Sequence, residues 1–258
     1  MEQNIINESI KFDPQSQTII AKLPFIHYPA VKLAPNKNKA LKVYQQQLKK
    51  LNDESNLGDK MDIIKSENKL QELGFVDYIK NLSPEMQHKL NHQHQLYIAR
   101  RAVWKESVST PCRIVFDASQ PTSSGFSLND ILAKGRNNLN KLQEIVIRWF
   151  THKFAITTDI RKMYNTIHLD EDEWCYQRYL WQTDLNPSEP PQDKVIKTLI
   201  YGVRSSGNQA EQGLRKIAKL SKYQRPKACE AIEDDIYVDD CMSGKEDKQA
   251  AITLSEEI

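Results

Sequence analysis

Two apolar segments that end in acidic residues limit the folds open to this chain of 258 residues. Residues 154–159 form a β-prone run ending in Asp159, and apolar residues then recur at helical spacing over 160–167. This pattern predicts a helix that begins where the strand stops. Residues 236–242 place Asp239-Asp240 between β-prone neighbours, which predicts a strand, a tight turn and a second strand. If the two segments are neighbours in one sheet, their three carboxylates converge on one point.

Each acidic segment also has a simpler interpretation. Asp159 is of a type favoured as a helix N-cap, and Asp239-Asp240 could be a solvated turn. Adjacent carboxylates repel each other, however, and a bound cation would neutralise them. Three converging carboxylates would suit two Mg²⁺ ions about 3.5–4 Å apart, a centre for phosphoryl transfer whose oxygen ligands Mn²⁺ also accepts.

Charge is divided unevenly along the chain. Residues 1–150 carry 21 Lys and Arg against 15 Asp and Glu, whereas residues 151–258 carry 15 against 19. A basic half beside an acidic half would suit a polyanion held near metal-binding carboxylates. Ordinary scatter of surface charge explains such a split as well.

Other features exclude several classes of protein. An apolar fraction of 39% with ten Tyr and four Trp indicates a globular rather than a disordered chain. The four cysteines contain no CxxC pair, so neither a disulfide framework nor a Cys-based zinc site is expected. No stretch approaches the roughly 18 apolar residues of a membrane helix, and no secretory signal is evident. Neither a membrane partner nor secretion is therefore expected.

The remaining pattern mixes helices and strands. Residues 1–38 contain four prolines and predict an extended leader with little helix. Helices are predicted over 41–51, about 60–73, from a Ser83 cap onward, and over 139–150. The β-rich runs 97–104 and 112–116 flank a polar loop, which predicts a hairpin.

The acidic segments resemble the catalytic motifs of reverse transcriptases, specifically those of the BEL/Pao group of LTR retrotransposons. Tyr237-Val238-Asp239-Asp240 is similar to motif C, and residues 159–164 have the Asp-x-x-Lys-Met-aromatic form of motif A. Other segments are similar to the group's boxes in order and spacing, namely 113–119 followed by 127–130, then 177–181 and 201–206.

This resemblance implies an α+β fold with the fingers and palm of a right-hand polymerase, in which helices back an antiparallel palm sheet. Residues 1–38 would be the leader, 39–150 the fingers and the entry to the palm, and 151–258 the palm. The chain would return to the fingers at about 171–200. The thumb would be absent, because only 243–258 follow motif C and the chain would be truncated before it.

The resemblance also assigns site residues. Asp159, Asp239 and Asp240 would be the catalytic and metal-binding residues, with two Mg²⁺ ions as cofactor. The nucleotide-binding residues would be Lys105, Arg113, Asp117, Tyr164, Tyr201 and Gly202. Arg113 and Lys105 would hold the triphosphate. Tyr164 would lie under the incoming sugar and reject a ribose 2′-hydroxyl by steric clash, although its spacing also suits a core aromatic.

The implied function is RNA- or DNA-templated transfer of a dNMP from a dNTP onto a primer 3′-hydroxyl. The chain would belong to a larger Pol polyprotein, in a cytoplasmic virus-like particle or in the nucleus. One alternative is an inactive retroelement remnant that at most binds nucleic acid, because Gly207 stands where the group usually has proline. A second is an unrelated helical interaction protein whose acids are caps and turns.

Overall fold

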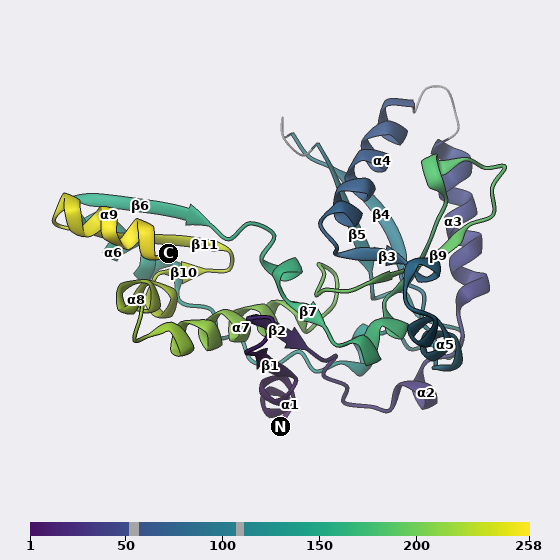
Figure 1. The fold of residues 1–258 in the computed structure, drawn as a ribbon, viewed down its shortest axis with the longest axis horizontal. Helices are drawn as coiled ribbons and strands as arrows, with labels where there is room; N and C mark the ends of the chain where they lie inside the picture. The colour runs from purple at the N-terminus through teal and green to yellow at the C-terminus, as the bar shows by residue number, and fades with distance from the viewer. Residues whose placement is uncertain (52–56, 107–110) are drawn as a thin grey trace.

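Four small sheets joined by helices make up the described residues 1–51, 57–106 and 111–258 of this computed structural model. The sheet that carries the acids lies at one end of an elongated molecule, and the hairpin of β4 and β5 lies at the other (Figure 1). Helix α7, Ser206–Ser221, runs through the middle part between them (Figure 1). The architecture is α+β, as the sequence predicts.

The acid-bearing sheet has the strand order β10-β11-β6 and is antiparallel throughout. Its strands are β10 Ile236–Tyr237, β11 Asp240–Lys245 and β6 Phe154–Asp159. Cys241 and Ile156 on one face pack with Leu254 of α9, Lys248–Glu257, and with α8, Pro226–Asp234. The opposite face exposes Asp159 and Asp240. Helices therefore back one face and leave the acids open to solvent.

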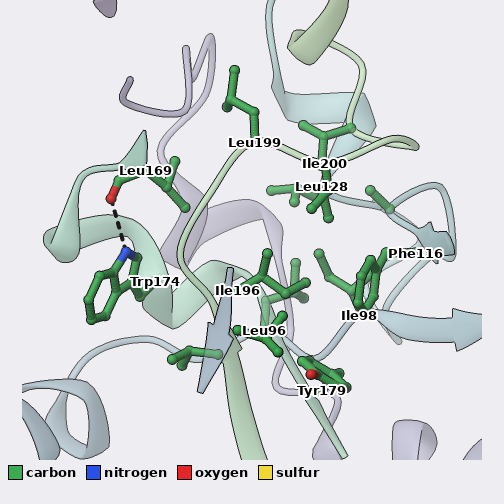
Figure 2. Close-up of a cluster of buried hydrophobic side chains, with 14 of the residues drawn as sticks. Leu96, Ile98, Phe116, Leu128, Leu169, Trp174, Tyr179, Ile196, Leu199 and Ile200 are labelled. Atoms are coloured by element: carbon green, nitrogen blue, oxygen red, sulfur yellow. Dashed lines mark hydrogen bonds between the residues drawn. The ribbon is translucent and has the colours of Figure 1, made fainter. Parts of the chain in front are cut away.

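The main hydrophobic core lies around the sheet β3-β9-β8. Its strands are β3 Val76–Tyr78, β9 Gln192–Ile196 and β8 Arg178–Trp181. Figure 2 shows Phe116 and Ile196 in this core, beside the Trp174 indole that donates to the Leu169 carbonyl at 2.9 Å. Because β9 pairs with both β3 and β8, segment 171–200 joins a strand from the first part of the chain.

Several predicted elements are confirmed. Helices α3 Lys37–Leu51, α4 Leu57–Glu72 and α5 Pro84–His92 are present, and the Ser83 hydroxyl caps α5 by accepting from Met86 N–H. Helix α6, Leu142–Thr151, begins later than predicted. Strands β4 Ala99–Trp104 and β5 Cys112–Asp117 form the predicted hairpin, and the 107–110 part of its loop lies outside the described residues.

The prediction of an extended leader over 1–38 is wrong. This segment forms α1 Glu2–Glu8, a hairpin of β1 Ile10–Asp13 and β2 Thr18–Ala21, and α2 Pro29–Lys32. Strand β2 pairs in parallel with β7, His168–Leu169. The prolines do not oppose this structure, because Pro14 lies in the hairpin turn and Pro29 opens a helix, both favourable positions.

The helix predicted after Asp159 is also wrong. Only the short 3₁₀ segment η4, Met163–Thr166, follows β6. Lys162 adopts left-handed backbone with φ of 56°, which interrupts a right-handed helix, and Ile160 N–H bonds across to the Asp239 carbonyl. The other 3₁₀ segments are η2 Ile79–Asn81, η3 Asn129–Ile131, η5 Glu171–Tyr176 and η6 Thr183–Leu185. No helix among the described residues is long and apolar enough to cross a membrane.

Candidate active site

The three acids gather at one end of the sheet β10-β11-β6. Strand register places Asp240 directly opposite Asp159, so their side chains project from the same face. Asp239 lies in the two-residue turn between β10 and β11, and its carbonyl accepts from Ile160 N–H at 2.7 Å. The arrowhead of β6 points toward the middle part of the molecule (Figure 1). The strands are thus neighbours, which was the condition for an acidic cluster.

Backbone strain marks the turn that carries Asp239. Val238, the first turn residue, has φ of 61°, a conformation that a β-branched side chain rarely adopts. Such strain costs of order 1–3 kcal/mol and persists only where the surrounding structure imposes it. Here the strand pairing on both sides of the turn imposes it.

The acids are of the residue type that binds divalent cations, but their side chains are not arranged to hold one. Within 1–51, 57–106 and 111–258, no three His, Cys, Asp or Glu side chains form a group that could hold a metal ion. Carboxylate oxygens are the ligands that Mg²⁺ prefers. Asp159 and Asp240 are exposed, so their side chains can rotate at low cost. The backbone therefore brings the acids together, whereas their carboxylates do not converge.

Two tyrosines lie beside the acids. The rings of Tyr164, from η4, and Tyr201, from the turn before α7, meet edge to face with centroids 4.2 Å apart. Burial and the nearby charge of Asp239 raise the pKa of both phenols. Asp159 raises the pKa of Tyr201 further, and Arg113 lowers it. Tyr164 and Tyr201 thus lie within electrostatic reach of Asp239, and Arg113 lies within electrostatic reach of Tyr201.

Gly202 fixes the turn that carries Tyr201. Its φ is 102°, and a Cβ there would lie 2.0 Å from the Phe116 carbonyl oxygen of β5. Asn129 holds the same turn, because its amide donates to the Gly202 carbonyl at 2.8 Å and accepts from Arg204 N–H at 2.8 Å. Only glycine permits both this conformation and this close approach. Gly202 is consequently a positioning residue rather than a ligand.

The structure does not bring two predicted residues to the site. The Asp117 carboxylate pairs with Arg101 at 2.7 Å and accepts from Ser119 N–H. Lys105 is exposed near the end of the hairpin, where its backbone N–H donates to the Pro111 carbonyl. Among the described residues neither side chain contacts the acids or the tyrosines.

A cavity of about 330 Å³ is lined in part by Tyr164. Val238, Gly207 and Met163 also line it, and part of its wall carries the exposed cations Lys134, Arg136 and Arg204. Sequence reasoning assigned none of these three cations to the site, although Arg204 stands in the matching box 201–206. Their position makes this wall attractive to an anionic strand.

Helix α1 supports the basic wall. The Glu2 carboxylate accepts from Lys134 N–H at 2.9 Å, and the Gln3 amide oxygen accepts from Arg136 N–H at 2.8 Å. Gln3 also bonds to Asn208 of α7. The N-terminal residues therefore build part of the site, a role that no sequence spacing indicates.

No protein-family model matches the chain, and no curated protein matches it. The site is accordingly defined by its own geometry. It comprises a cluster of acids on a strand end and turn, a tyrosine pair, and two groups of cations.

Proposed function

We propose that the chain is the fingers–palm part of a retrotransposon reverse transcriptase of the BEL/Pao type, within a larger Pol polyprotein. It would transfer a dNMP from a dNTP to a primer 3′-hydroxyl on an RNA or DNA template. The observation that carries the proposal is the pairing of Asp240 with Asp159 beside the Asp239 turn. The catalytic motifs A and C of a reverse transcriptase must bring their acids together in this way. Two unrelated acidic turns have no reason to be paired.

The side chains support this chemistry in distinct ways. Two Mg²⁺ ions, when bound by Asp159, Asp239 and Asp240, would activate the attacking hydroxyl and stabilise the leaving pyrophosphate. The Tyr164 ring, held edge to face by Tyr201, offers a rigid floor for a sugar. Arg113 offers a planar guanidinium suited to two phosphate oxygens.

The basic wall suits the polymer substrate. Lys134, Arg136 and Arg204 line the same cavity as Tyr164, and cations of this kind supply most of the affinity for a nucleic acid backbone. A second candidate is a nucleic-acid-binding module without catalysis. Such a module needs the basic wall and not the metal centre.

Primer extension distinguishes the two candidates. The assay would use this chain with RNA and DNA templates, each in Mg²⁺ and in Mn²⁺, against Asp239→Asn. Asp234→Asn is the matched control, because Asp234 is an exposed acid at the end of α8. We expect incorporation that Asp239→Asn lowers at least 100-fold and Asp234→Asn leaves unchanged. Template binding with no Asp239-dependent incorporation under any condition would support the binding module and overturn the enzyme.

A further inference from the structure

Lys162 combines three unfavourable features in one residue. Its backbone is left-handed, with φ of 56°. Its side chain is half-buried, with the ammonium 5.7 Å from the centre of the Phe75 ring. Burial and the charges of Arg161, Lys69 and Arg113 lower the pKa of Lys162. Left-handed backbone, burial of a charge and repulsion by neighbouring cations each cost free energy.

Nothing in the described part of the chain neutralises this cation. No carboxylate there forms an ion pair with Lys162, Arg161 or Arg113, whereas Lys69 pairs with Glu72 at 3.2 Å. Arg161 and Arg113 are exposed. The result is a local excess of positive charge, centred on a lysine that is partly withdrawn from water.

The excess of charge lies near Tyr201, in a different cavity from the one that the basic wall lines. Phe75, under the Lys162 ammonium, lines the same small cavity as Tyr201. Arg113 acts electrostatically on both Lys162 and Tyr201. Tyr201 in turn lies within reach of the charges of Asp159 and Asp239. An anion bound between Lys162 and Arg113 would therefore lie on the Tyr201 side of the site.

We propose that Lys162 is a polyphosphate-binding residue that, together with Arg113, holds the phosphate chain of an incoming nucleotide. This inference rests on the proposed function for the identity of the nucleotide. A lysine supplies a compact point charge on a flexible stem, and an arginine supplies a planar fork for two oxygens. Bound phosphate would offset the repulsion between the two cations, which explains why the strained arrangement is retained.

Binding of inorganic tripolyphosphate in EDTA tests the site without metal, primer or template. We expect Lys162→Gln to weaken binding about tenfold, the loss of one charge-assisted contact. Lys162→Arg should retain most of the affinity. Lys153→Gln is the matched control, because Lys153 is exposed and lies over the Phe154 ring at 5.8 Å. Lys162→Gly, which relieves the left-handed strain, should fold at least as well as wild type and still bind weakly.

Steady-state primer extension then separates this inference from the proposed function. We expect Lys162→Gln to raise the KM for dNTP about tenfold with a smaller change in kcat. Unchanged tripolyphosphate affinity or an unchanged KM in Lys162→Gln would overturn the role of Lys162 and leave the polymerase intact. If tripolyphosphate binding depends on Lys162 but the wild-type chain extends no primer, the phosphate site is supported and the proposed polymerase function is overturned.

Discussion

Asp240 lies directly opposite Asp159 in the antiparallel pair of β11 and β6, although the two acids belong to distant parts of the chain. Like charges in directly opposed cross-strand positions destabilise a sheet. Exposed polar residues of many types would fill these positions at lower cost. Under the proposed function, a cation bound between the two carboxylates would offset this repulsion.

The first prediction concerns these two acids. In EDTA, Asp159→Asn and Asp240→Asn should each raise the free energy of unfolding by about 0.5 kcal/mol, because the cross-strand repulsion is removed. Mg²⁺ at millimolar concentration should raise the Tm of the wild-type chain and not that of either variant. Thermal unfolding followed by circular dichroism measures both effects. An equal Mg²⁺ effect on Asp159→Asn would show that the ion binds elsewhere.

Replacing the Tyr164 ring should relax the choice of sugar. Tyr164→Val removes the surface that would clash with a ribose 2′-hydroxyl, so the preference for dNTP over rNTP should fall at least tenfold. The lost edge-to-face contact with Tyr201 should lower stability by about 0.5–1.5 kcal/mol. Competing dNTP and rNTP in primer extension measure the preference. Tyr223→Val, at a fully exposed position, should change neither quantity.

Local patterns in the sequence predict the acid-bearing hairpin and much of the helix content. The turn at Asp239 depends on residues adjacent in the chain, as does the Ser83 cap of α5, so both are readable from short segments. The helix expected after Asp159 is interrupted at Lys162, whose backbone is left-handed with φ of 56°. Apolar spacing alone does not reveal such a break.

The site is only partly readable for the same reason. Asp159, Asp239 and Tyr164 stand in motifs, whereas the support that Gln3 gives to Arg136 arises from tertiary packing alone. The surroundings of Asp117 also escape a reading of motifs. Asp117 stands within a matching box, yet its carboxylate is engaged by Arg101 across the hairpin. Cross-strand pairing sets that contact, and no alignment of motifs specifies it.

Gly202 gives a stability test of the turn that holds Tyr201. Gly202→Ala places a methyl group 2.0 Å from the Phe116 carbonyl oxygen and should cost more than about 2 kcal/mol, because backbone must move. Gly125→Ala is the control, since Gly125 also has positive φ, 86°, but open space around its Cβ. It should cost only about 1–2 kcal/mol. Urea unfolding of both variants measures the difference, and equal losses would contradict the close approach.

The buried pair of Lys194 and Glu67 should behave very differently from an exposed pair. Both side chains are fully buried, with Nζ 2.8 Å from the carboxylate. Lys194→Met leaves the buried Glu67 carboxylate without its cation and should lower the free energy of unfolding by about 3–5 kcal/mol. Adding Glu67→Gln to this variant should recover most of that loss. Lys69→Met, which breaks an exposed pair on the same helix, should cost under about 0.5 kcal/mol. Denaturant unfolding compares the three variants.

Glu173 should make stability depend on pH. Burial raises the pKa of its carboxyl from 4.5 to about 7, which outweighs the Leu23 N–H donated to it at 3.2 Å and the charge of Lys22. Because the folded chain then holds this proton at pH values where the unfolded chain has released it, the free energy of unfolding falls as pH rises from 4.5 to 7. The total loss should be at most about 3 kcal/mol.

Glu173→Gln removes this titration, so the free energy of unfolding of the variant should fall less as pH rises. The variant should be more stable than wild type at pH 8, and the two should differ less at pH 4.5. Urea unfolding across that range measures the slope. Glu171→Gln, at an exposed position on the same 3₁₀ segment, should keep the wild-type slope. The same decline in Glu173→Gln as in wild type would assign the pH dependence to other groups. A flattened decline would assign the pH dependence to burial of the Glu173 carboxyl.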